Sequence, residues 1–110
     1  MEGSAPSKKM TEYQIGLYKF YPDKLEVIFN NEEVQKLTLR EGKLLELLVS
    51  KQNELCSHKE ILHDLWGQND FFAKKSLNVF ITHLRKFLAK DPAIRIENMH
   101  NQGFILKIQE

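Results

Sequence analysis

The chain has 110 residues, of which 42% are hydrophobic and 28% are charged, and its formal net charge is +1 at pH 7. This length allows one hydrophobic core of ordinary size, and the composition is that of a soluble globular domain and excludes a disordered chain. Apolar runs fall short of the roughly 20 residues that span a bilayer, and the N-terminus has no signal-peptide pattern, so we expect a cytoplasmic protein that does not contact membranes.

The residue types that carry most enzyme chemistry are few and scattered. The single cysteine, Cys56, cannot form an internal disulfide and is expected to be a small buried thiol. His58 and His63 are five residues apart, about 140° around a helix, so they cannot share a metal ion. The sequence has no evident glycine-rich phosphate loop, nucleophile motif or carboxylate pair. We therefore expect no enzyme activity, no cofactor and no metal site.

The N-terminal region is predicted to form strands. Residues 1–10 are small, polar and unpatterned, and we expect them to be a linker remnant or an expression tail ahead of a domain at residues 11–110. Apolar and polar residues then alternate in "YQIGLYKFY", "KLEVIFN" and "EEVQKL", which are separated by the turn formers Pro22-Asp23 and Asn30-Asn31. The alternation predicts an antiparallel sheet of two or three strands.

Two helix starts follow the strands. Thr38 with Glu41, and Ser57 with Glu60, fit the capping box, in which a hydroxyl and a carboxylate satisfy free amides at a helix start. Apolar residues at helical spacing follow each box, and Gly67 is expected to end the second helix. A third helix is predicted over about residues 73–89. After Asp91-Pro92 the alternation returns on both sides of "HNQG", which predicts a terminal hairpin.

The third helix sorts its residues by face. The segment "KKSLNVFITHLRKFLAK", residues 74–90, contains five basic residues and no acidic one. Its large apolar residues share one sector of a helical wheel, which must be buried: Leu77, Phe80, Ile81, Leu84, Phe87 and Leu88. The opposite face holds Lys75, Val79, Thr82 and Lys86, flanked by Asn78 and Arg85 on one side and by His83 on the other. An ordinary surface helix mixes acids with bases, so this segregation points to an anionic partner.

A cationic face with one exposed apolar side chain suits the major groove of DNA. Lysine and arginine neutralise phosphates, and Val79 can rest against a thymine methyl group. Asn78, Thr82 and His83 can form hydrogen bonds with base edges. The alternative is a solvated basic face that happens to carry one valine.

Several motifs together resemble the C-terminal effector domain of OmpR/PhoB-type two-component response regulators, over about residues 15–108. They are Leu37-Thr38, the leucine-rich first helix, Leu65-Trp66-Gly67, the Val-x-Ile-x-x-Leu-Arg-Lys run from Val79 to Lys86, and Gly103-Phe104. The resemblance implies an α+β winged helix-turn-helix with an N-terminal four-stranded antiparallel sheet, three helices and a C-terminal β-hairpin wing. It also implies sequence-specific binding of double-stranded DNA, with the recognition helix at about 73–89 in the major groove and the wing at about 98–103 near the minor groove.

The resemblance implies a role for each matching position. Val79 and His83 match residues that meet bases, and Lys75, Thr82 and Arg85 match positions that touch bases or phosphates. Asn98 and His100 match wing residues that approach the minor groove, with Asn101 beside them, and Trp66 matches a tryptophan that contacts the DNA backbone. The loop containing Gln68, Asn69, Asp70 and Phe71 corresponds to a segment through which some relatives touch RNA polymerase.

The chain also departs from the family pattern. Many relatives have arginine in place of Thr82, His83 and His100, and a second glycine in place of Asn101. Arginine bridges guanine in a bidentate way and holds a narrow minor groove, and histidine does both less well near neutral pH. We therefore expect modest affinity and a base preference that cannot be carried over from relatives. Asn101 suits a turn because asparagine tolerates the left-handed conformation.

Regulation is expected to lie outside this domain. Relatives carry a phosphoaccepting receiver domain ahead of it, and phosphorylation promotes dimers that occupy repeated half-sites. The implied partners are double-stranded DNA, RNA polymerase, the receiver domain of the full-length protein and its sensor kinase, and we expect an excised domain that is monomeric alone and dimeric on DNA repeats. Because winged helices also bind proteins through the same surface, the alternative is a protein-interaction module with weak or no DNA binding.

Overall fold

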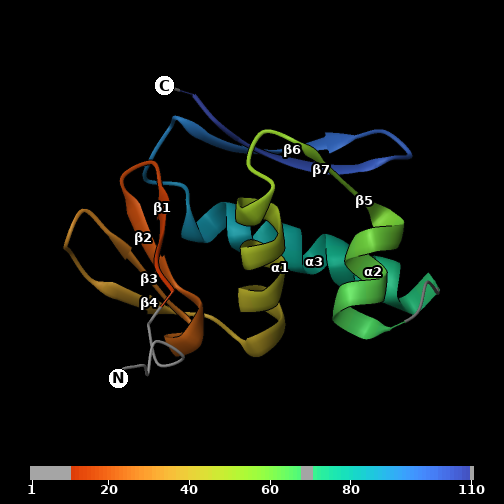
Figure 1. Ribbon diagram of the computed structural model, residues 1–110, viewed down its shortest axis with the longest axis horizontal. Coiled ribbons are helices and arrows are strands. Elements are labelled where there is room, and N and C mark those ends of the chain that lie inside the picture. The colour runs from red at the N-terminus through yellow and green to blue at the C-terminus, as the bar shows by residue number, and fades with distance from the viewer. Residues whose placement is uncertain (1–10, 68–70, 110) are drawn as a thin grey trace, which may run out of the picture.

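The structure is a computed structural model that describes residues 11–67 and 73–109, and the backbone alone of residues 71 and 72. These residues form a four-stranded antiparallel sheet, three α-helices and a second sheet of three strands (Figure 1). The predicted α+β class and the order of sheet, helices and hairpin are confirmed. The expected tail at residues 1–10 lies outside the described residues. Within the described part, no helix has both the length and the apolar composition that a bilayer crossing requires.

The first sheet has the four strands that the resemblance implied, where alternation alone predicted two or three. Its strands pair in chain order: β1 (Tyr13–Ile15), β2 (Tyr18–Tyr21), β3 (Glu26–Phe29) and β4 (Val34–Lys36). The extra strand arises because Gly16, with φ of 58°, makes a tight turn inside the first alternating segment. A short 3-10 helix, η2 (Pro22–Lys24), makes the next turn. Ile15, Phe20 and Val27 are fully buried in the core.

Helix α1 (Leu39–Ser50) begins with the complete capping box that the sequence predicted. The Thr38 hydroxyl accepts a hydrogen bond from the Glu41 amide at 3.2 Å, and the Glu41 carboxylate accepts one from the Thr38 amide at 2.8 Å. Leu44, Leu45 and Leu48 are buried on its inner face. Their burial supplies most of the stability of the helix, since isolated helices of this length are marginal in water.

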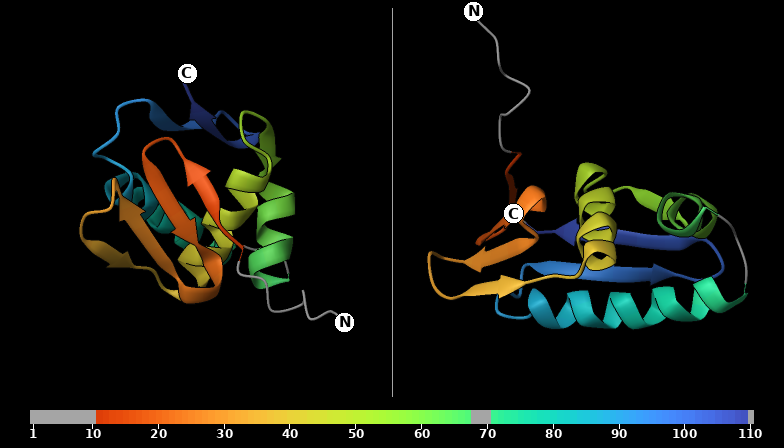
Figure 2. Two further views of the ribbon diagram at one scale, coloured as in Figure 1. Left: turned by 60° about the vertical axis from the view of Figure 1, so that its left-hand side comes forward. Right: turned by 90° about the horizontal axis from the view of Figure 1, so that it is seen from below.

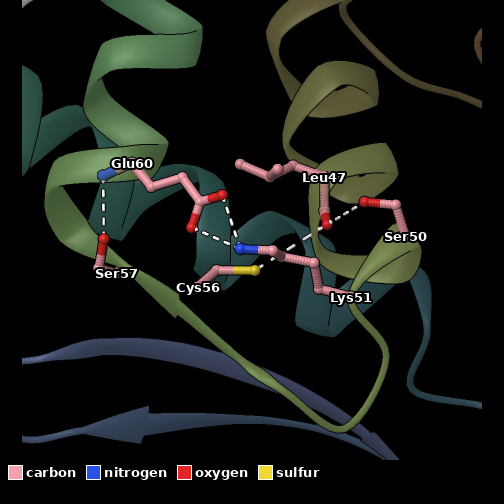
Figure 3. Close-up of polar contacts among 6 residues, drawn as sticks. All are labelled: Leu47, Ser50, Lys51, Cys56, Ser57 and Glu60. Atoms are coloured by element: carbon pink, nitrogen blue, oxygen red, sulfur yellow. Dashed lines mark hydrogen bonds and ion pairs between the residues drawn. The ribbon is translucent and has the colours of Figure 1, made fainter.

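Helix α2 (His58–Trp66) has only half of its predicted capping box. The Ser57 hydroxyl accepts from the Glu60 amide at 3.1 Å, but the Glu60 carboxylate instead accepts from the Lys51 ammonium at 2.7 and 2.9 Å (Figure 3). Lys51 is the C-cap residue of α1, so this ion pair joins the end of α1 to the start of α2. Gly67 ends α2 in the left-handed conformation, with φ of 75°, as predicted.

The second sheet has the order β5-β7-β6, with β5 (Leu55–Ser57), β6 (Ile94–Met99) and β7 (Gly103–Ile108) all antiparallel. The last two strands are the predicted hairpin, and Asn101 adopts the left-handed conformation in its turn, with φ of 61°. The sequence analysis missed β5, which is too short for alternation to show. Its central residue, Cys56, is the buried thiol that was predicted, with Sγ 3.9 Å from the Leu47 carbonyl oxygen (Figure 3).

Helix α3 (Phe71–Phe87) begins and ends slightly earlier than the predicted range of 73–89. Ala73 is buried one turn before Leu77 and extends the apolar stripe toward the N-terminus. At the other end the chain turns ahead of Pro92, because proline disfavours a helical conformation in the residue before it. Phe71 is therefore the first residue of the helix, and the prediction that placed it in a loop was wrong.

Polar contacts join the first sheet to the loop after α3. The buried Asp91 carboxylate accepts from the Leu17 amide at 2.8 Å and from the Ala93 amide at 2.9 Å. The Tyr18 hydroxyl accepts from the Lys90 amide at 3.1 Å. In Figure 1, α1 stands at the centre, with the first sheet on one side, α2 on the other and the β6–β7 hairpin across the top. The two sheets and the helices thus share one core.

Candidate nucleic-acid interface

The outward face of α3 is exposed, as its helical wheel predicted. In the right-hand view of Figure 2, α3 lies along the outer edge of the molecule, with β6 and β7 on its inner side. Val79 is 52% exposed, and the side chains around it are also exposed: Lys75, Asn78, Thr82, Arg85 and Lys86. The inner face is buried at Leu77, Ile81, Leu84 and Leu88, with Phe80 and Phe87 partly buried beside it. No acidic residue belongs to α3, so its outer surface is cationic.

A groove between α3 and the wing brings together residues that are distant in the chain. It is lined by Lys74, Lys75, Leu77 and Asn78 from α3, by Asn98, His100 and Asn101 from the wing, and by His58 from α2. None of these lining residues is acidic. The predicted wing residues therefore lie beside the first turns of the predicted recognition helix. Sequence reasoning missed His58 and Lys74 as members of this surface, although Lys74 opens the acid-free segment.

His58 joins the groove to the core. Its ring contacts Phe104 edge to face, with centroids 5.5 Å apart, and its amide donates to the Gln102 carbonyl oxygen in the wing at 2.9 Å. Burial, and then the positive charge of Lys74, lower the pKa of His58 below the ordinary value for histidine. His58 thus favours the neutral form in the free protein.

The His83 ring is held by a residue of α1. Its Nδ1 lies 2.8 Å from Oε2 of Glu41, whose other oxygen, Oε1, accepts from the Thr38 amide. The Glu41 side chain is 7% exposed, whereas the His83 side chain is 45% exposed. The sequence analysis assigned Glu41 only a capping role, because nothing in the pattern of α1 shows that its carboxylate reaches α3.

Trp66 lies at the edge of the interface, beside the Phe80 ring and the Arg40 guanidinium. Its ring stacks on Phe80 of α3, with centroids 5.9 Å apart, and the guanidinium of Arg40 lies 5.0 Å from the Trp66 ring centroid. Trp66 is partly buried, so it packs at the boundary of the core while part of it faces solvent. Arg40 places a further cation beside this predicted phosphate contact, and the sequence analysis did not single it out.

Two predicted contact residues also make internal hydrogen bonds. Arg85 donates from its guanidinium to the Ile96 carbonyl oxygen at 2.7 and 3.2 Å, which ties the end of α3 to β6. The Thr82 hydroxyl donates to the Asn78 carbonyl oxygen one turn earlier at 3.0 Å. Because its proton is used within the helix, the exposed Thr82 oxygen faces solvent as an acceptor.

The predicted loop for RNA polymerase falls mostly outside the described residues. Gln68, Asn69 and Asp70 are not described, and Phe71 belongs to α3.

Three helices in which α3 exposes a cationic face, followed by a hairpin that flanks this face, define a winged helix-turn-helix domain. A family model described as transcriptional regulatory protein, C terminal, matches residues 31–106. The chain belongs to this family, the OmpR/PhoB-type DNA-binding effector domains of response regulators, which confirms the resemblance found in its sequence.

Curated relatives agree with this family. The chain is 34% identical over 100 residues to the transcriptional regulatory protein RprY of Bacteroides fragilis, a match that covers 91% of this chain and 42% of that protein. It is 41% identical over 81 residues to the probable transcriptional regulator ycf27 of Porphyra purpurea, which covers 72% of this chain and 33% of that protein. The chain therefore spans less than half the length of these relatives.

Solved structures show the same fold. The DNA-binding domain of CpxR from Escherichia coli matches with a TM-score of 0.79 at 17% identity, covering 91% of this chain and 99% of that one. The DNA-binding domain of RstA from Klebsiella pneumoniae, solved in complex with the RstA box, matches with a TM-score of 0.73 at 23% identity, covering 88% and 97%.

Proposed function

We propose that this domain binds duplex DNA sequence-specifically through α3 in the major groove and the β6–β7 turn near the adjacent minor groove. The observation that carries the proposal is the acid-free outer face of α3, with the exposed Val79 at its centre and the wing residues alongside. Lysines on this face neutralise phosphates and release counterions, and the polar groups read base edges.

The proposed contacts are of three kinds: with bases, with phosphates and through the wing. Base contacts come from Val79 and His83, with Asn78 and Thr82 beside them. Phosphate contacts come from Lys75, Lys86 and Trp66, and wing contacts from Asn98, His100 and Asn101. Arg85 acts chiefly as a positioning residue, because its guanidinium is already bonded to Ile96, and any of its remaining N–H groups can meet the backbone of the DNA.

The full-length protein is proposed to act as a cytoplasmic response regulator. The lengths of its relatives support a further domain, which we propose to be a receiver phosphorylated by a sensor kinase. Phosphorylation would then pair two effector domains on repeated half-sites, while the domain alone stays monomeric. RNA polymerase is the proposed further partner, reached through the segment around residues 68–71.

A mobility-shift assay across a salt series tests the proposal. We expect binding of duplex DNA at low salt that weakens steeply as salt is raised, because each neutralised phosphate releases counterions. Selection of bound oligonucleotides from a random pool then defines the half-site. Failure to retain any duplex at low salt would contradict DNA binding and favour a protein-interaction module.

A further inference from the structure

The contact between His83 and Glu41 engages one of the two ring nitrogens of His83. Glu41 has two carboxylate oxygens, and each has one partner: the Thr38 amide on Oε1 and His83 Nδ1 on Oε2. Among the described residues, no hydrogen-bond partner contacts His83 Nε2. Nδ1 is therefore engaged by the protein, and Nε2 of this half-exposed ring is available to a ligand.

The hydrogen-bonding capacities of these groups allow only one arrangement in the neutral ring. The Thr38 amide can only donate, and an ionised carboxylate can only accept. Glu41 therefore accepts on both oxygens, and the proton of His83 must lie on Nδ1. In a neutral imidazole the second nitrogen is then an acceptor, so Nε2 carries the lone pair.

His83 also has the right place on α3 to meet a base. It lies one turn after Val79, on the same exposed face, because residues four apart are neighbours on a helix. The edge-to-face contact of its ring with Phe80, at 6.4 Å between centroids, further restrains the ring. The ring is thus oriented by α1 and by its own helix before any DNA arrives.

We propose that Glu41 fixes the proton of His83 on Nδ1 and so makes Nε2 an acceptor that selects adenine or cytosine at the base it meets. In the major groove, adenine and cytosine present amino donors, N6 and N4, whereas guanine and thymine present acceptors that would face the Nε2 lone pair. This inference rests on the proposed function, and it makes Glu41 a positioning residue for specificity.

A single isosteric change reverses the proposed arrangement. In Glu41→Gln the amide oxygen must still accept from Thr38, since that amide cannot reverse its role, and the NH₂ group is left facing Nδ1. Nδ1 then accepts, and the ring proton moves to Nε2, which becomes a donor. A donor suits guanine, thymine and N7 of adenine, and it no longer suits cytosine, which presents only an amino donor. The fold is preserved because glutamine also completes a capping box. His83→Gln provides a second variant, whose amide can either donate or accept.

The first measurement uses the free protein and does not depend on DNA. Nitrogen-15 NMR of the histidine rings at about pH 8 distinguishes protonated from unprotonated ring nitrogens. We expect the proton of His83 on Nδ1 in the wild type and on Nε2 in Glu41→Gln. A wild-type ring protonated on Nε2 would overturn the inference.

The second measurement selects bound oligonucleotides at the same pH. We expect the wild type to prefer adenine or cytosine at one half-site position by about tenfold. We expect Glu41→Gln to disfavour cytosine there and to accept guanine or thymine, and His83→Gln to lose the preference. Equal preferences in wild type and Glu41→Gln, with DNA still bound, would overturn the inference alone. Loss of all binding by the wild type would instead overturn the proposed function and, with it, the role of His83 as a reader.

Discussion

Gly103 and Cys56 lie so close across the β5–β7 pair that no side chain fits between them. A Cβ on Gly103 would collide with the backbone carbonyl group of Cys56 and would lie only 2.8 Å from the Cα of Ser57. Because Ser57 is the N-cap residue of α2, this close approach places the first residue of β7 directly beside the start of that helix.

We expect Gly103→Ala to lower the free energy of unfolding by about 1–3 kcal/mol, since the clash is with backbone that cannot move aside without breaking the strand pair. Chemical denaturation measures the loss. Gln102→Ala, at the neighbouring exposed position, is the matched control and is expected to stay within about 0.5 kcal/mol of the wild type. Equal stability of Gly103→Ala and wild type would contradict the β5–β7 pairing.

Val79→Asp is expected to weaken specific DNA binding roughly tenfold or more, because it places an anion among phosphates and removes the apolar contact. Val34→Asp on β4 makes the same chemical change at another exposed valine, 44% exposed against 52% for Val79. Titration of both variants with the selected half-site should separate them, with circular dichroism confirming that each is folded. Unchanged binding by Val79→Asp would show that α3 is not the reader.

Lys86→Ala should reduce the salt dependence of binding. If Lys86 neutralises one phosphate, the slope of log K against log salt falls in magnitude by about 1, with similar loss for specific and non-specific DNA. Lys36→Ala on β4 removes the same charge outside α3 and the wing and is the control. A slope that changes equally in both variants would point to net charge instead of a local phosphate contact.

His58 is expected to make the domain less stable as the pH falls. Burial and Lys74 lower its pKa in the folded state, so the unfolded chain binds more protons as the pH falls through the ordinary histidine value of 6.5. Stability contributed by the neutral ring is therefore present above that value and is lost below it. Denaturation at a series of pH values should show this loss in the wild type and a smaller one in His58→Gln. His63→Gln, at an exposed histidine, is the control, and an identical loss in wild type and His58→Gln would contradict the assignment.

The elements that the sequence predicted well are those defined by local rules. The capping box at Thr38 and the end at Gly67 depend on neighbouring residues, and α3 depends on a regular apolar stripe. The strand β5 and the turn at Gly16 were missed because three-residue strands are too short for alternation to distinguish. Strands of this length are defined by their partners, which lie elsewhere in the chain.

The candidate site also has a part that local sequence predicts and a part that depends on residues distant in the chain. The exposed face of α3 could be predicted because helical period alone sets which side chains point outward. The contact between Glu41 and His83 could not, because these residues are 42 positions apart and meet through the packing of two helices. The Arg85 contact with β6 was missed for the same reason.

Asp91 connects the first sheet to the loop after α3. Its carboxylate accepts hydrogen bonds from Leu17, in the β1–β2 turn, and from Ala93, in the loop that leaves α3. The Tyr18 hydroxyl accepts another from Lys90 in the same loop. The first sheet is therefore joined by hydrogen bonds to the segment that leaves the C-terminal end of α3. A shift of that sheet would therefore reach the C-terminal end of α3, the proposed recognition helix, through Asp91 and Lys90.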